Sequence, residues 1–163
     1  MSTISTTTGN TPAQRLAELG ITLPPAPAPI ANFVTHVREG NLLFLSGQGP
    51  LDADGTLSKG KVGTDVSVEK AYADARLTGI NLLAVMQEVL SDLGRVKRVV
   101  KLLGMVNAAP DFCDHPAVIN GCSDLFNDVF GPQGVHARSA IGMGSLPNQI
   151  TVEIEAIIAL NDD

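Results

Sequence analysis

The sequence predicts an α+β fold in which one sheet carries two helices on a single face. β-branched and other apolar residues gather in residues 33–50, 96–108 and 137–160, while helical spacing of apolar residues fills residues 67–93 and 114–131. The expected element order is therefore β-β-α-β-α-β-β. Because each connection that leaves and re-enters the sheet contains a helix, both helices are expected on the same face.

Length and composition limit the function classes. The chain has 163 residues, of which 44% are hydrophobic, enough for one domain with a core. A net charge of −6, with 11 Lys and Arg residues spread along the chain, argues against nucleic acid as the main partner. No apolar stretch reaches the length of a membrane span, and residues 1–10 lack the pattern of a signal peptide, so we expect a cytoplasmic protein without membrane contact. Cys113 and Cys122 fit no zinc or CxxC spacing and are expected to be reduced thiols.

The N-terminal part predicts an extension over residues 1–30, ahead of a domain over residues 31–163. Thr11 suits a helix cap, Pro12 the first helical turn and Gly20 the end of a short helix. The following linker holds four prolines, Pro24, Pro25, Pro27 and Pro29. Such a segment is expected to run extended across the surface.

The elements of the main domain follow from local patterns. A hairpin is expected to turn at residues 39–41, and residues 51–65 have the composition of a loop. Apolar residues at a period close to 3.6 predict a long helix over residues 67–93. A second helix is expected to begin after Asp114, and residues 137–160 are expected to close the chain as another hairpin.

The last strand separates two kinds of side chain. Successive residues of a strand point to opposite faces. One face is wholly apolar and is expected under the helices: Ile150, Val152, Ile154, Ala156, Ile158 and Leu160. The other face carries Glu153 and Glu155, which on general grounds could simply meet water.

The preceding strand argues against a solvated second face. Arg138, Ala140, Gly142 and Gly144 share one parity there, and this set is too bare for a face in water. Oligomerisation is the usual way to cover such a face, so we expect the face that bears Arg138 and Gly142 to be buried between subunits. An arginine in that place has a planar fork of donors suited to a carboxylate ligand, and a structural salt bridge is the alternative.

Three motifs together resemble the RidA/YjgF family of imine and enamine deaminases, also called L-PSP endoribonuclease-like. They are "ARS" followed by "LP" and "VEIEAIIAL", the segment "GNLLFLSGQGP", and the segment "VINGCSDLF". The resemblance covers roughly residues 31–160 and is to a longer-chain subgroup. It implies a chorismate-mutase-like fold, a homotrimer with sites between subunits, a small imino or keto acid as the ligand, and no cofactor.

The resemblance also implies roles for individual residues. Arg138 would hold the substrate carboxylate, and Glu153 would place or activate the hydrolytic water. Asn120 and Ser46 would line the pocket.

Two positions depart from the family pattern. Phe33 stands where deaminase members carry a tyrosine, and Ala140 stands where they carry a cysteine. Both would line the substrate site. The loss of the hydroxyl and the thiol favours a substrate bulkier than the small 2-imino acids, or weak activity on those.

Three readings of the function follow. The first is a metal-free hydrolytic deaminase that gives a 2-keto acid and ammonia, which needs a carboxylate clamp, a placed water and proton transfer. The second is a non-catalytic module that binds a keto acid in the same cleft. An endoribonuclease is less favoured because of the charge. The three histidines have no metal-ligand spacing, and His136 is expected to be a solvent-facing loop residue.

Overall fold

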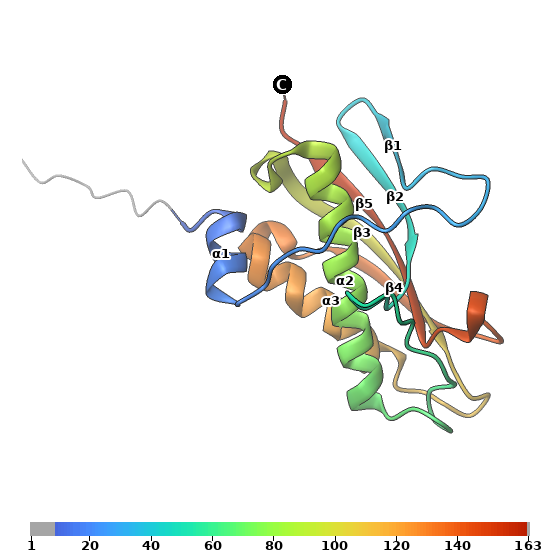
Figure 1. Cartoon of the computed structure of the whole chain (residues 1–163). Helices are drawn as coiled ribbons and strands as arrows, with labels where there is room; N and C mark the ends of the chain where they lie inside the picture. The colour runs from blue at the N-terminus through green and yellow to red at the C-terminus, as the bar shows by residue number, and fades with distance from the viewer. Residues whose placement is uncertain (1–8, 163) are drawn as a thin grey trace, which may run out of the picture.

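A computed structural model describes residues 9–162 and contains the predicted elements in the predicted order. After the N-terminal helix α1 (Pro12–Glu18) the main domain follows, with a short 3₁₀ turn after each of α2, α3 and β4 (Figure 1). Its elements are β1 (His36–Glu39), β2 (Leu42–Gln48), α2 (Val68–Leu90), β3 (Val96–Asn107), α3 (His115–Phe130), β4 (Ala137–Met143) and β5 (Val152–Leu160). The predicted α+β fold class is confirmed.

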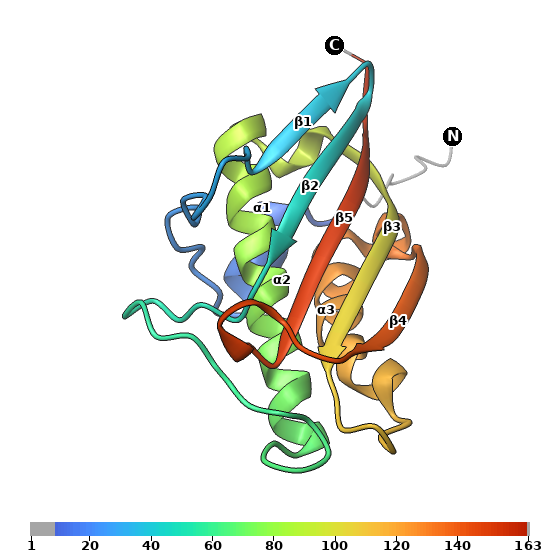
Figure 2. The same cartoon turned by 90° about the vertical axis from the view of Figure 1, so that its right-hand side faces the viewer.

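The five strands form one sheet in the order β1-β2-β5-β3-β4 (Figure 2). All neighbours are antiparallel except β3 and β4, which run parallel. The predicted hairpin over residues 137–160 is therefore wrong, because β3 lies between β4 and β5. A helical crossover through α3 brings β4 parallel to β3, and β5 then fills the space between β3 and β2. Local patterns indicate that two strands are present but not which strands pair.

Helices α2 and α3 pack together on one face of this sheet, as predicted (Figure 1). The even-numbered residues of β5 lie beneath them, and Val152, Ile154 and Ile158 are fully buried. Cys122 on α3 is also buried and Cys113 exposed, and both are free thiols. No helix within residues 9–162 is long and apolar enough to cross a membrane.

The predicted N-terminal helix is confirmed with its cap. Thr11 Oγ1 accepts from the Gln14 amide at 3.2 Å, and Gln14 Oε1 accepts from the Thr11 amide at 2.8 Å, which forms a capping box. Arg15 reaches the carbonyl of Asp128 on α3 at 3.4 Å, and Leu16 is buried. The chain then runs without helix or strand to β1.

The long connection between β2 and α2 is fixed by one buried carboxylate. Asp74 on α2 is 2% exposed, and its Oδ2 accepts from Ser58 Oγ at 2.8 Å and from Thr151 Oγ1 at 2.7 Å. Lys70 pairs with the other carboxylate oxygen. Buried charges are stable only when paired and hydrogen-bonded, and Asp74 meets both conditions. The network joins the loop, α2 and the start of β5.

Candidate functional site

Glu153 lies on the face of the sheet that the helices leave open. It stands opposite Met105 of β3, while its neighbours Val152 and Ile154 are buried on the helical side. Its carboxylate passes directly over Gly47 of β2, where a Cβ would collide with Oε1 of Glu153. Gly47 of the "SGQ" segment is thus required because a side chain there would displace the carboxylate.

The Glu153 carboxyl is half-buried, and this burial raises its pKa, with a further contribution from the charge of Glu155. No hydrogen bond or cation from residues 9–162 offsets these effects. A carboxylate whose proton affinity is raised in this way is suited to accept a proton from water and to return it.

Glu153→Gln is expected to stabilise the folded chain at neutral pH. Because the pKa of Glu153 is higher in the folded state than in the unfolded state, folding is weakened as pH rises through that interval, and glutamine removes this cost. The melting temperature of the variant should exceed that of the wild type at pH 7, and the two should converge toward pH 4. Thermal melts from pH 4 to pH 8 would measure this, with Glu88→Gln on the exposed side of α2 as the control. A lower melting temperature of Glu153→Gln at pH 7 would contradict it.

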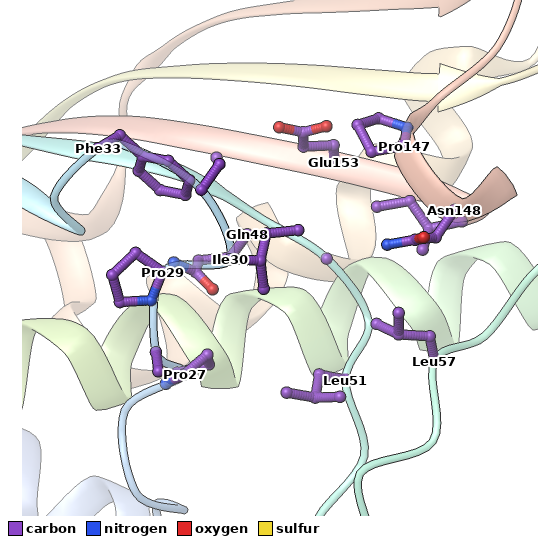
Figure 3. Close-up of a pocket in the computed structure, with 15 residues that line it drawn as sticks. Pro27, Pro29, Ile30, Phe33, Gln48, Leu51, Leu57, Pro147, Asn148 and Glu153 are labelled. Carbon is purple, nitrogen blue, oxygen red and sulfur yellow. The ribbon is translucent and has the colours of Figure 1, made fainter.

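A pocket of ≈ 430 Å³ opens beside Glu153 (Figure 3). Its polar groups come from Glu153, Gln48 and Asn148. The rest of the lining is mostly apolar: Pro27, Ala28, Pro29, Ile30, Ala31, Phe33, Leu51, Leu57, Pro147 and Ile150. The proline-rich linker therefore forms one wall of the pocket, which its composition alone did not indicate.

Phe33 and Ser46 take different places around this pocket. Phe33 lines it and is 43% exposed. Ser46 is not among the lining residues. Its Oγ donates to the carbonyl of Val34 at 2.7 Å and its amide donates to the carbonyl of Thr35 at 2.9 Å. In this chain Ser46 thus holds the segment that carries Phe33.

Arg138 lies on the opposite face of the sheet from Glu153. In the sheet it stands opposite the buried Leu102 of β3. Its side chain reaches α3, where Nη1 donates to Asn120 Oδ1 at 2.9 Å. Nη1 also donates to Ser123 Oγ at 3.0 Å, and Nη2 lies 3.4 Å from the carbonyl of Pro116. The arginine is half-buried, and its alignment comes from α3.

The expectation that Arg138 and Gly142 share the uncovered face is therefore wrong. A Cβ at Gly142 would collide with His115 of α3, and Ala140 packs against the core beneath that helix. Ala140 also does not line the pocket of Glu153 in the same chain. The bare residues of β4 are small because α3 lies close above them.

His136 is half-buried, which corrects the expectation of a solvent-facing loop residue. Its Nδ1 lies 2.5 Å from the carbonyl of Gly134 and its Nε2 lies 2.9 Å from Ser123 Oγ. A smaller pocket of ≈ 180 Å³ is lined by Ser123, Asn127, Val135, His136 and Arg138. Sequence reasoning missed Ser123, although its spacing of three residues from Asn120 places both on one side of the helix.

The predicted site residues thus form two groups in one chain. Arg138 and Asn120 belong to the helical side, whereas Glu153 and Phe33 belong to the pocket on the open side. The register makes the separation plain, because Leu102 opposite Arg138 and Met105 opposite Glu153 point to different faces of β3. Among residues 9–162 no group of His, Cys, Asp and Glu could hold a metal ion.

Comparison with known proteins identifies similar chains over most of this length. Residues 13–153 match the family described as "YjgF/chorismate_mutase-like, putative endoribonuclease", a match that begins inside α1. Protein TCP17 of Trypanosoma cruzi is 43% identical over 92% of this chain and 94% of its own. A 2-iminobutanoate/2-iminopropanoate deaminase of Salmonella typhimurium is 31% identical over 81% of this chain and 90% of its own.

Two solved structures are similar as well. The protein Atu1372 of Agrobacterium tumefaciens is 44% identical with a TM-score of 0.84, over 90% of this chain and 91% of that one. A "putative endoribonuclease" of Shewanella oneidensis is 31% identical with a TM-score of 0.89, over 93% of this chain and 100% of that one.

Proposed function

The chain belongs to the YjgF/chorismate-mutase-like family, and from this premise we propose that it is a hydrolytic deaminase working as a homotrimer. Its substrates would be 2-imino or enamine acids, and its products 2-keto acids and ammonia. The family includes 2-iminobutanoate/2-iminopropanoate deaminases that are 29% and 31% identical to this chain. The observation that supports the proposal is the half-buried carboxyl of Glu153, which has a raised pKa and lies beside a pocket of ≈ 430 Å³.

The reaction requires one base that also acts as an acid. Water adds to the carbon of the C=N bond, Glu153 takes a proton from that water, and the nitrogen receives a proton. The resulting carbinolamine expels ammonia as the C–N bond breaks and the C=O bond forms. A carboxyl group with a raised pKa can serve both transfers, which supports Glu153 in this role.

Arg138 would hold the substrate carboxylate. A guanidinium binds a carboxylate through two parallel N–H donors, and such charge-assisted pairs are stronger than neutral hydrogen bonds. Asn120 and Ser123 both bind Nη1 and so fix the plane of the guanidinium. Glu153 cannot be its partner within the chain, because the sheet lies between them.

Assembly of several copies would bring the two groups together. The open face carries large exposed apolar residues in register with Glu153: Val37, Leu42, Phe44 and Ile141. Such a face favours association. In a ring of three copies, Arg138 of one subunit and Glu153 of its neighbour would line the same cleft from opposite sides, with the substrate between them, and each ring would hold three equivalent sites.

The test is accelerated release of ammonia. An amino-acid oxidase would generate a panel of 2-imino acids, and ammonia would be followed with and without the protein, while sedimentation measures the assembly. We expect acceleration and a trimer. Binding of keto acids without acceleration would instead favour the non-catalytic module, for which the absent hydroxyl of Phe33 is the supporting observation. A monomer with the open face in water would remove the shared site.

A further inference from the structure

The pocket beside Glu153 has a wall that comes from the N-terminal extension. Pro27, Pro29 and Ile30 lie along one side, and Leu51 and Leu57 lie across from them (Figure 3). Ile30 is 79% exposed even though it lines the pocket. A large apolar side chain in that position leaves surface that a ligand could cover.

This wall is suited to an apolar group, and its backbone is already restricted before a ligand binds. Among the described residues that line the pocket, Glu153 alone carries a charge. Proline restricts the backbone, so the wall loses little conformational freedom when a ligand binds. The volume of ≈ 430 Å³ falls within the range of about 300–1,000 Å³ that is usual for pockets of small-molecule ligands.

We propose that this wall is a subsite for the side chain of the substrate, and that the substrates are 2-imino acids with branched or aromatic side chains. This inference rests on the proposed function, since it places the reacting carbon beside Glu153. It separates the chain from relatives named for 2-iminobutanoate and 2-iminopropanoate, whose side chains are only an ethyl and a methyl group.

Calorimetric titration with two stable 2-keto acids tests the subsite. Phenylpyruvate is expected to bind the wild type about tenfold or more tightly than pyruvate, because its ring covers apolar surface. Ile30→Asp should remove this preference by weakening phenylpyruvate binding more than pyruvate binding. Val34→Asp is the matched control, since Val34 is 58% exposed and does not line the pocket.

The outcomes separate the subsite from the function. Equal affinity for both acids, each lost in Arg138→Ala, would overturn the subsite and leave the proposed function standing. Affinity for either acid that does not depend on Arg138 would overturn both. A preference for phenylpyruvate that survives Ile30→Asp would also overturn the assignment of this wall.

A second inference concerns Arg138 and rests on different contacts. Nδ1 of His136 lies 2.5 Å from the carbonyl oxygen of Gly134. Because a carbonyl can only accept a hydrogen bond, Nδ1 carries a proton and donates it. Burial and the charge of Arg138 lower the pKa of His136, which keeps the ring neutral. Nε2 must then accept, and its partner at 2.9 Å is the hydroxyl of Ser123.

This order of donors leaves the lone pairs of the Ser123 hydroxyl free to accept from Arg138. With its proton directed at His136, Ser123 Oγ presents lone pairs to Nη1 of Arg138 at 3.0 Å. The geometry points to Ser123 and His136 as positioning residues, which hold the guanidinium in the orientation that a carboxylate needs. They act through Arg138 and need not touch the substrate.

Affinity for 2-keto acids measures this role. Ser123→Ala and His136→Phe should each weaken pyruvate binding about tenfold, on the scale of a hydrogen bond to a charged group. The double variant should bind pyruvate no more weakly than either single variant, because Ser123 and His136 act in series through one hydrogen-bonded relay. His136→Gln, which keeps an acceptor for Ser123, should recover most of the affinity.

Packing alone would give a different result. The ring of His136 packs edge-on against Phe126 with centroids 6.4 Å apart, and His136→Phe keeps a ring there. A lower melting temperature with unchanged pyruvate affinity would overturn the positioning role. Tyr72→Phe is the control, because it removes a hydrogen bond to Asp124 on the same helix without touching Arg138.

Discussion

Trimers assembled from a mixture of Arg138→Ala and Glu153→Gln chains are expected to recover roughly a quarter of wild-type turnover, although each variant alone is inactive. In the proposed trimer, each site takes its arginine from one subunit and its glutamate from the neighbour. In a random mixture half of the arginine contributions and half of the glutamate contributions are intact, and both are intact together in a quarter of the sites. The measurement is ammonia release after the two variants are unfolded and refolded together in equal amounts.

The control mixture pairs Arg138→Ala with the double variant Arg138→Ala/Glu153→Gln. No site in that mixture contains an arginine, so activity should stay at the background level. Two different affinity tags would show that mixed trimers had formed. Mixed trimers without recovered activity would mean that both residues of a site come from one chain, contrary to their positions on opposite faces of the sheet.

Loss of Arg138 is expected to abolish binding of 2-keto acids and to leave the proposed trimer assembled and folded. Arg138→Lys keeps the charge but loses the planar fork, and should weaken binding by about 1–3 kcal/mol, the range for hydrogen bonds to charged groups. The fold should survive because Arg138 is half-buried and its partners Asn120 and Ser123 lie on one helix. Titration calorimetry with pyruvate would measure the affinity, and sedimentation the assembly.

Arg98→Ala provides the matched control for this loss. Arg98 is an exposed arginine on the neighbouring strand β3, where it lies 3.4 Å from the carbonyl of Val135. Its removal changes the net charge equally and should leave pyruvate affinity nearly unchanged. Unchanged affinity in Arg138→Ala would show that the carboxylate is held elsewhere.

The sequence predicted the elements well because their patterns are long. The alternation in β5 covers nine residues, and its apolar half is buried as expected. The residues that cap and begin α1 were equally clear signals in the sequence. Strand β4 was harder, because "ARSAIGM" has no polar and apolar alternation. Its parity shows which residues share a face, but only its pairing with β3 decides which face that is.

Residues of the candidate site were predictable only where they belong to a sequence motif. The sequence motif named Arg138 with Asn120, and the structure joins them by a hydrogen bond. Ser123 and His136 were missed because their contact depends on how α3 lies over β4. The wall formed by residues 27–31 was missed because it meets Glu153 only after the sheet has formed, across more than a hundred residues of sequence.

The buried Asp74 restricts where the chain could change in length during evolution. Ser58 and Thr151 bind its carboxylate, while Asn81 holds the carbonyls of Gly49 and Leu51, so the start and the middle of the connection are tied to α2. Between Leu51 and Ser58, the tight turn over residues 52–56 lies outside these bonds. Insertions would be tolerated at that turn, whereas one nearer to Ser58 would move Leu57 and so reshape the pocket without altering any residue that lines it.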